Sequence, residues 1–190
     1  VTTGAFTVDG GSGVDTLKGS TGNDVIDGKG DADLIYGGAG NDDLTGGAGD
    51  DTLTGNGGND TFRADSGTDT ITDLTTGDVL IVSGSATANA TNIATFVATN
   101  STTNGGTANL SGANTSITID MTLSASGAYS ITGGTGADTL KGGSGADTII
   151  GGIGNDTITG NGGADIITGN AGNDTLTGNA GNDRFNVDLD

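Results

Sequence analysis

The sequence predicts an all-β fold: a right-handed parallel β-roll, or β-helix, in two arrays joined by a β-rich linker, with no helices of note. Three observations predict it. Most of the 190-residue chain repeats every nine residues, the chain contains 40 glycines, and each repeat carries one large apolar residue at the same place. A fixed short period is typical of a solenoid, in which each repeat buries its apolar side chain against its neighbours.

The repeats form two arrays without insertions. The first array has eight units over residues 10–81, and the second has six units over residues 133–186. A linker rich in Thr, Ser, Ala and Asn connects them over residues 82–132. We expect a short lead-in strand over residues 1–9. Residues 187–190 would begin a run-out like the one that ends the first array.

Each unit follows the pattern G-G-x-G-x-D-x-U-x, in which U is a large apolar residue. We expect the Gly-rich positions 1–6 to form a turn, because glycine adopts positive φ without steric cost. Positions 7–9 would form a minimal strand with residue 8 pointing inward and a β-favouring residue, often Thr, facing outward at position 7. Two units complete one coil, and successive coils stack as parallel strands about 4.8 Å apart. Position 8 is occupied by Leu17, Ile26, Ile35, Leu44, Leu53, Phe62, Ile71, Leu80, Leu140, Ile149, Ile158, Ile167, Leu176 and Phe185.

The linker contains two stretches of alternating apolar and polar residues. The clearer one, Ile117–Leu123, predicts a strand with one apolar face. A weaker candidate spans Ile93–Ala98, and residues 101–106 are expected to form a loop. The sequence leaves open whether the linker continues the coil or forms a separate layer.

A longer repeat underlies the two arrays. Gly4–Gly19 matches Gly127–Gly142, and Asn59–Asp65 matches Asn182–Asp188, both at an offset of 123 residues. We therefore expect one and a half copies of a 123-residue unit, excerpted from a longer tandem protein.

Composition narrows the function classes. The chain has a formal charge of −19, with 24 acidic residues, all of them Asp, against five Lys plus Arg. This balance alone is typical of disorder, and the strict period argues against disorder. The negative charge disfavours nucleic acid and anionic membranes as partners. No apolar run is long enough for membrane insertion. Because the sequence lacks His, Cys and Glu, only Asp could act as an acid or base, and we predict that the chain is not an enzyme.

Stacking is expected to place each position-6 aspartate beside the aspartate two units later, along one edge of the roll. Carboxylates a few ångströms apart need a counter-charge, which a hard dication held by carboxylate and carbonyl oxygens would supply. Calcium suits such a flexible cage better than magnesium, and zinc is disfavoured without His or Cys. The four expected columns are Asp15, Asp33, Asp51 and Asp69; Asp24, Asp42, Asp60 and Asp78; Asp138, Asp156 and Asp174; and Asp147, Asp165 and Asp183.

These columns predict up to ten calcium ions, six in the first array and four in the second, which would offset the charge of −19. The arrays bury too few apolar side chains to offset the cost of ordering a Gly-rich chain. We therefore expect metal binding and folding to be one event.

The nonapeptides resemble the RTX (repeats-in-toxin) family of hemolysin-type calcium-binding repeats, which form β-rolls and are usually exported by type I secretion. The resemblance implies that the position-6 aspartates and backbone carbonyls of the Gly-rich turns bind calcium. Asp73 replaces the first Gly of its unit, and Asp31 and Thr76 replace the fourth Gly, so carbonyl geometry is in doubt there. The implied carbonyls are those of Gly10, Ser12, Gly19, Thr21, Gly28, Gly30, Gly37, Ala39, Gly46, Ala48, Gly133, Thr135, Gly142, Ser144, Gly151, Ile153, Gly160 and Gly162.

The linker composition, the scarcity of Lys and the absence of Cys resemble calcium-dependent bacterial S-layer proteins. This resemblance implies a secreted structural segment that folds on extracellular calcium and self-associates in a lattice at the bacterial cell surface. The alternative is an accessory calcium-binding module of a type I-secreted enzyme, toxin or adhesin. An ice-binding array is disfavoured, because position 3 is Thr only at Thr21, Thr75 and Thr135.

Overall fold

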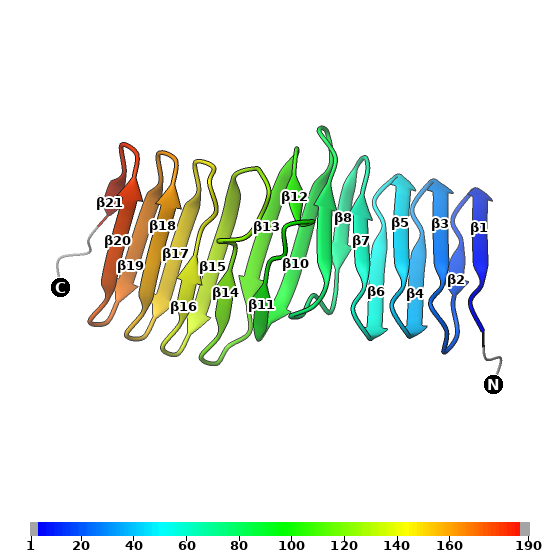
Figure 1. Ribbon diagram of the computed structural model, residues 1–190, viewed down its shortest axis with the longest axis horizontal. Coiled ribbons are helices and arrows are strands. Elements are labelled where there is room, and N and C mark those ends of the chain that lie inside the picture. The colour runs from blue at the N-terminus through cyan, green and yellow to red at the C-terminus, as the bar shows by residue number, and fades with distance from the viewer. Residues whose placement is uncertain (1–3, 187–190) are drawn as a thin grey trace.

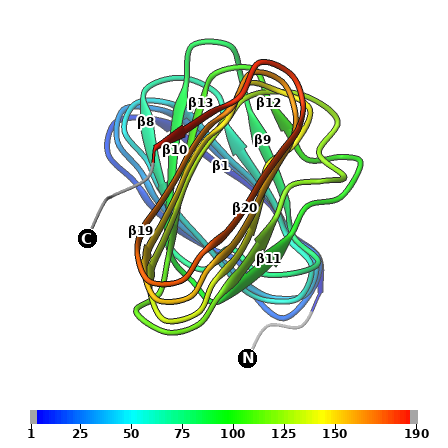
Figure 2. The ribbon, with the colours of Figure 1, turned by 90° about the vertical axis from the view of Figure 1, so that its left-hand side faces the viewer.

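The structure, a computed structural model, describes residues 4–186 as one elongated stack of coils, in which the first and last described strands lie at opposite ends (Figure 1). Seen along the stack, the coils superpose as a flattened ring (Figure 2). All strand pairs are parallel, and no helix occurs within residues 4–186. The prediction of an all-β parallel roll is confirmed.

The described residues form 21 strands in three sheets. The strands are β1 Thr7–Ser12, β2 Thr16–Lys18, β3 Val25–Gly30, β4 Leu34–Ala39, β5 Asp43–Ala48, β6 Thr52–Gly57, β7 Thr61–Ala64, β8 Thr68–Ile71, β9 Val79–Val82, β10 Thr87–Ile93, β11 Thr95–Val97, β12 Thr103–Asn104, β13 Thr107–Gly112, β14 Thr118–Asp120, β15 Tyr129–Thr135, β16 Thr139–Lys141, β17 Thr148–Ile153, β18 Thr157–Gly162, β19 Ile166–Ala171, β20 Thr175–Ala180 and β21 Arg184–Asn186.

One sheet runs the length of the stack and faces two shorter ones in turn. The long sheet has the order β2-β4-β6-β8-β10-β13-β15-β17-β19-β21. The N-terminal sheet has the order β1-β3-β5-β7-β9-β12, and the C-terminal sheet has the order β11-β14-β16-β18-β20. Each array is therefore a two-walled roll in which consecutive units alternate between walls.

The strands pair at the offset that two units predict, for example Ile26 with Leu44. They are longer than the predicted three residues. β3 comprises positions 7–9 of one unit and positions 1–3 of the next, and the pairing continues there between Lys29 and Gly47. The prediction of a six-residue turn was wrong, because Gly47 at position 2 takes a φ of 102°, which bends the strand without breaking its pairing. The turn proper is positions 4–6.

The position-8 side chains form the core, as predicted. Eleven of the fourteen are at most 1% exposed. The other three lie in the outermost coils, which have a neighbour on one side only: Leu17 and Leu176 are partly buried, and Phe185 is 44% exposed. Stacking of coil on coil is thus the source of apolar burial.

The linker continues the coil, which the sequence left open. β10, β13 and β15 extend the long sheet, while β12 ends the N-terminal sheet and β11 and β14 begin the C-terminal one. The middle coils therefore contribute strands to three sheets. Their offsets lengthen from 19 residues (Thr68 to Thr87) to 21 (Ala108 to Tyr129) in the long sheet, and the offset reaches 23 residues between β11 and β14 (Thr95 to Thr118).

Individual strand predictions in the linker had mixed outcomes. The weaker candidate, Ile93–Ala98, contains β11, and β14 lies within Ile117–Leu123. Leu123 was wrongly assigned to the apolar face: it is 55% exposed, because the Ser124 N–H donates to the Met121 carbonyl (2.9 Å) and turns the chain. β10 and β13 were not predicted, and β12 lies in the expected loop.

The structure tests the predicted lead-in strand only in part and does not test the predicted run-out. The lead-in strand begins at Thr7 and runs on into the first unit as β1. Residues 1–3 and the expected run-out at 187–190 lie outside the described residues.

Candidate metal sites in the stacked turns

The position-6 aspartates stack in the four predicted columns. In every column the backbone N–H of one aspartate donates to Oδ1 of the aspartate one coil later, at N···O distances of 2.8–3.1 Å. Ten such bonds link successive aspartates within the columns, six in the first array and four in the second. The neighbouring carboxylates are therefore linked through peptide groups, and each has one oxygen left over.

The remaining carboxylate oxygen is buried in most of the turns. Seven Oδ2 atoms have no hydrogen-bond partner within the described residues, although buried polar atoms nearly always have one. Asp24 and Asp147 differ, since their Oδ2 atoms accept the N–H of Ser20 (2.6 Å) and Gly143 (2.8 Å). The seven belong to Asp33, Asp42, Asp51, Asp69, Asp138, Asp156 and Asp165.

A backbone carbonyl faces the same space as this oxygen. A Cβ placed on Gly10 would lie 2.9 Å from Asp15 Oδ2 and 2.7 Å from the Gly28 carbonyl of the next coil. The position-1 glycine thus keeps open a space on which two hydrogen-bond acceptors converge. The same arrangement occurs above Gly10, Gly19, Gly28, Gly37, Gly133, Gly142, Gly151 and Gly160.

Burial raises the pKa of nine of the column carboxyl groups. It raises the pKa of Asp69 to about 7 and those of Asp60 and Asp147 to about 6. In each case desolvation is the largest cause, the N–H donor opposes it, and neighbouring carboxylates add to it. The sequence suggested that repulsion between stacked carboxylates is the main cost of keeping them ionised. In these three groups the desolvation of the charge raises the pKa more than that repulsion does. The same direction holds for Asp42, Asp51, Asp78, Asp138, Asp156 and Asp165.

The ion pairs of the described residues lie outside the columns. Lys29 pairs with Asp27 (2.7 Å), and Lys141 pairs with Asp120 (2.8 Å). Within residues 4–186, no group of three or more acidic side chains is close enough to hold a metal. Any cation in the turns must therefore rely on carbonyl oxygens for much of its coordination.

The carbonyls expected as ligands fall into two groups. Position-1 carbonyls of Gly28, Gly37, Gly46, Gly151 and Gly160 lie beside an aspartate Oδ2, and so do those of Gly55, Gly169 and Gly178, which the sequence prediction omitted. Two other carbonyls in the predicted set accept hydrogen bonds from the protein. The position-3 carbonyl of Ile153 accepts the Gly136 N–H at 2.7 Å, and the position-1 carbonyl of Gly142 accepts a hydrogen bond from Asn161 Nδ2 at 2.8 Å.

The last unit of the first array satisfies its own oxygens, where the sequence predicted altered geometry. Asp73 accepts the N–H groups of Gly55 (2.9 Å) and Asn56 (2.6 Å). Oδ2 of Asp78 accepts both the N–H (2.7 Å) and the hydroxyl (3.0 Å) of Thr75. This turn therefore has two donors to Oδ2, whereas the seven turns with an unpartnered Oδ2 have none.

A second ladder, at position 5, was missed. The Asn41 N–H donates to Asn23 Oδ1 (2.8 Å), and the Asn59 N–H to Asn41 Oδ1 (2.9 Å). This ladder runs in the opposite sense to the aspartate columns, because the acceptor belongs to the earlier coil. The recurring G-N-D triplet was the signal that could have revealed it.

Sequence comparison identifies the repeats. A family model described as the RTX calcium-binding nonapeptide repeat matches four copies, at residues 9–44, 36–71, 130–158 and 159–190, more than half of the chain. A comparison with curated proteins finds no match. Among the described residues, no helix is long and apolar enough to cross a membrane.

Proposed function

The chain belongs to the family of RTX calcium-binding nonapeptide repeats, and on that premise we propose that its buried aspartate turns are the calcium sites of a secreted structural protein. The observation that carries the proposal is the convergence of a carboxylate oxygen and a carbonyl oxygen on the same space in eight turns. In six of these turns no hydrogen-bond donor reaches the carboxylate oxygen, whereas in the other two, at Asp24 and Asp147, one backbone N–H does. Two acceptors are satisfied together by a cation, and oxygen-only sites favour calcium or magnesium.

Each site would be held by the Oδ2 of a position-6 aspartate and the position-1 carbonyl of the next coil. Bound calcium would supply positive charge and accept further oxygen ligands. Oδ1 stays on the peptide N–H of the preceding coil, so one carboxylate both joins two coils and faces the ion. Eight turns have both oxygens in place, and we propose eight ions, fewer than the ten that the sequence pairs suggested.

We propose further that the chain has no catalytic activity and serves as an extracellular segment of a bacterial surface lattice. Nearly all of its buried ionisable groups are the column aspartates, and the other buried side chains are apolar apart from Thr102, Asn104 and Ser124. The stack can be lengthened by repetition, and the 123-residue duplication is a repetition of this kind. Extracellular calcium is abundant enough to saturate weak sites of this class.

A calcium titration tests the proposal. Circular dichroism should show coil in EGTA and β-structure at high micromolar to millimolar calcium, with little response to equal magnesium. Calorimetry should count about eight ions per chain. A chain equally structured with and without calcium would overturn the assignment of the sites.

Light scattering on the same samples tests the lattice. Growth beyond the monomer in calcium is expected. A folded chain that stays monomeric would favour the accessory-module alternative.

A further inference from the structure

The outer face of the long sheet has almost no charge, although the chain carries −19 overall. The eight strands from β4 to β19 contain a single charged residue, Asp69, which is completely buried. The outward side chains of these strands are mostly Thr, Asn, Ser, Leu, Tyr and Ile. We call this surface the neutral face.

The other two walls carry charges on their outer surfaces. The N-terminal sheet presents Asp27, Lys29, Asp43 and Arg63, which form exposed ion pairs. The C-terminal sheet presents the Lys141–Asp120 pair. On the long sheet, Lys18 and Arg184 lie on the outermost strands β2 and β21. The Lys18 ammonium reaches over the Tyr36 ring of β4, 5.2 Å from its centre, and this positive charge would not repel an acidic neighbour.

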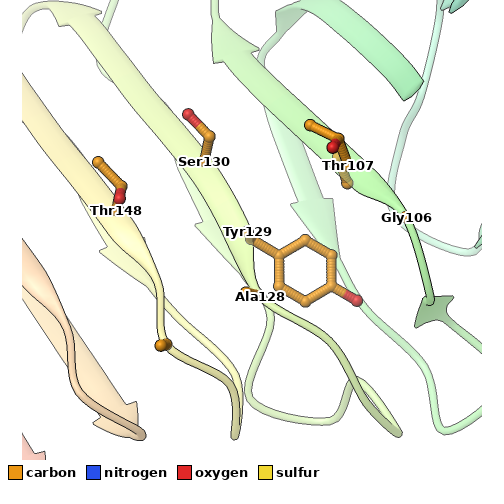
Figure 3. A pocket seen from close by; sticks show the side chains of 8 residues that line it. Gly106, Thr107, Ala128, Tyr129, Ser130 and Thr148 are labelled. Carbon is orange, nitrogen blue, oxygen red and sulfur yellow. The ribbon is translucent and has the colours of Figure 1, made fainter. Parts of the chain in front are cut away.

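The neutral face is hollowed at the edge where β13, β15 and β17 begin. A hollow of about 220 Å³ lies over β13, β15 and β17, and its lining includes the hydroxyls of Thr107, Ser130 and Thr148 (Figure 3). Its lining residues are also uncharged. Nothing on this face would repel an acidic neighbour.

We propose that the neutral face is the surface through which two copies of this chain associate. Two strongly acidic molecules repel one another wherever carboxylates meet, and like-charge contact suppresses association. The neutral face is the wall on which this repulsion is smallest. The proposal rests on the calcium-binding function above, since the sheet exists only in the folded chain and bound calcium offsets the charge of the columns behind it.

The size of the face agrees with a dimer interface. Eight strands spaced about 4.8 Å apart and about 20 Å long cover roughly 700 Å². Two copies would bury about 1,400 Å², within the range of specific interfaces.

A two-fold axis parallel to the strands and passing between β10 and β13 makes the face self-complementary. It lays β4 of one copy on β19 of the other, so Leu34 meets Ile166, which is 40% exposed. It also lays β6 on β17, so Thr52 meets Thr148. Apolar contacts then lie at both ends of the interface, and hydroxyl and amide groups lie between them.

Two matched double variants test the proposal. T52D/T148D places opposed carboxylates within the interface, while T61D/T157D makes the same change at position 7 on the other two walls, on β7 and β18. In millimolar calcium, sedimentation equilibrium should show a dimer for the wild type and T61D/T157D, and association at least tenfold weaker for T52D/T148D.

Circular dichroism on the same samples separates this proposal from the calcium assignment. All three proteins should fold in calcium. A wild type that folds but stays monomeric, including one that binds a neutral polysaccharide on this face instead, would overturn the neutral-face interface and leave the calcium sites intact. Equal weakening in both double variants would also overturn it, and failure of the wild type to fold would overturn both proposals.

Discussion

The array coils and the middle coils of residues 82–132 share one architecture but differ at the residue that precedes the core of each strand. Along the long sheet, Asp69 is in register with Ala88, Ala88 with Ala108, and Ala108 with Tyr129. The Tyr129 N–H then donates to Asp147 Oδ1 (2.7 Å), where the carboxylates resume. All five residues are at most 2% exposed.

The comparison shows that the coil itself does not need carboxylates. The middle coils fill the same column with methyl groups and one aromatic ring, and their offsets drift to 19–21 residues. The array coils place a buried carboxylate there at a strict offset of eighteen residues. The dependence on a cation that we propose would therefore arise from the aspartate columns, and the middle coils would be the part of the stack without that dependence.

The largest expected effect is that of acidification, which would neutralise the buried carboxylates that distinguish the array coils from the middle coils. The folded pKa of Asp69 is raised to about 7 and those of Asp60 and Asp147 to about 6, against about 3.9 in an unfolded chain. The folded state therefore binds protons more tightly than the unfolded chain. The stability that these protonated carboxyl groups contribute is fully present below pH 4 and is lost as pH rises to 6–7. Each pKa unit corresponds to about 1.4 kcal/mol, which amounts to several kcal/mol over the columns.

In EGTA, β-structure followed by circular dichroism should increase as pH falls from 7.5 to 5. In saturating calcium the same change should have little effect. A calcium-free chain that stays unfolded at pH 5 would contradict the importance of buried charge.

A carboxylate introduced into the column position of a middle coil should be buried as in the arrays, but without a calcium site to stabilise it. Ala108→Asp buries a charge without the open space that adjoins each array carboxylate, because the residue five places earlier is Thr103, where most array units have glycine. We expect a loss of about 2–4 kcal/mol of unfolding free energy that calcium does not restore. Thr95→Asp, on an exposed residue of β11 outside the neutral face, is the control and should cost less than about 1 kcal/mol. Urea denaturation in calcium measures both, and rescue of Ala108→Asp by calcium would contradict the prediction.

The converse change, Asp42→Asn, should have opposite signs with and without calcium. Asparagine keeps the Oδ1 that accepts the Asp24 N–H (2.8 Å) and places an amide donor where Oδ2 faces the Gly55 carbonyl. Without calcium we expect a gain of about 1–3 kcal/mol, seen as a lower trimethylamine N-oxide midpoint for folding in EGTA. With calcium we expect a higher calcium midpoint. Asp31→Asn, on an exposed residue in the left-handed region (φ 68°), should change neither midpoint.

Filling one open space should remove one ion. A Cβ on Gly37 would contact Asp42 Oδ2 and lie 2.9 Å from the Gly55 carbonyl, whereas a Cβ on Gly57 would meet nothing within 4 Å. Gly37→Ala should lower the calorimetric stoichiometry by one and raise the calcium midpoint severalfold. Gly57→Ala should leave both unchanged, and a loss of the same size in both variants would show that the effect is on the backbone and not on a site.

The fold was predictable from the sequence where one side chain per unit carries the pattern. Position 8 fixed the core, but the length of the strands was not visible, because positions 1–3 are mostly glycine and show no alternation. β10 and β13 were missed because their buried residues are largely alanine, which contrasts weakly with Thr and Asn. The paired triplets Thr87–Asn89 and Thr107–Asn109, now in register with each other, were the available signal.

The site was predictable to the level of its columns. The period placed each aspartate above the next, and the structure confirms that stacking. Which oxygen remains free depends on the peptide N–H of the neighbouring coil, and which carbonyl faces it depends on the direction of each peptide in the bend. Neither property appears in a pattern of residue types.

The smallest effect is expected at the exposed ion pairs of the array walls. Arg63 contacts both carboxylate oxygens of Asp43 (2.7 and 3.1 Å), but the two side chains are 38% and 41% exposed. Water and salt screen such a pair, so Arg63→Ala should cost about 0–1 kcal/mol in urea denaturation in calcium. That result would place the electrostatic control of the arrays in the buried columns, whereas a loss of about 3 kcal/mol would show that the outer charges also hold the coils together.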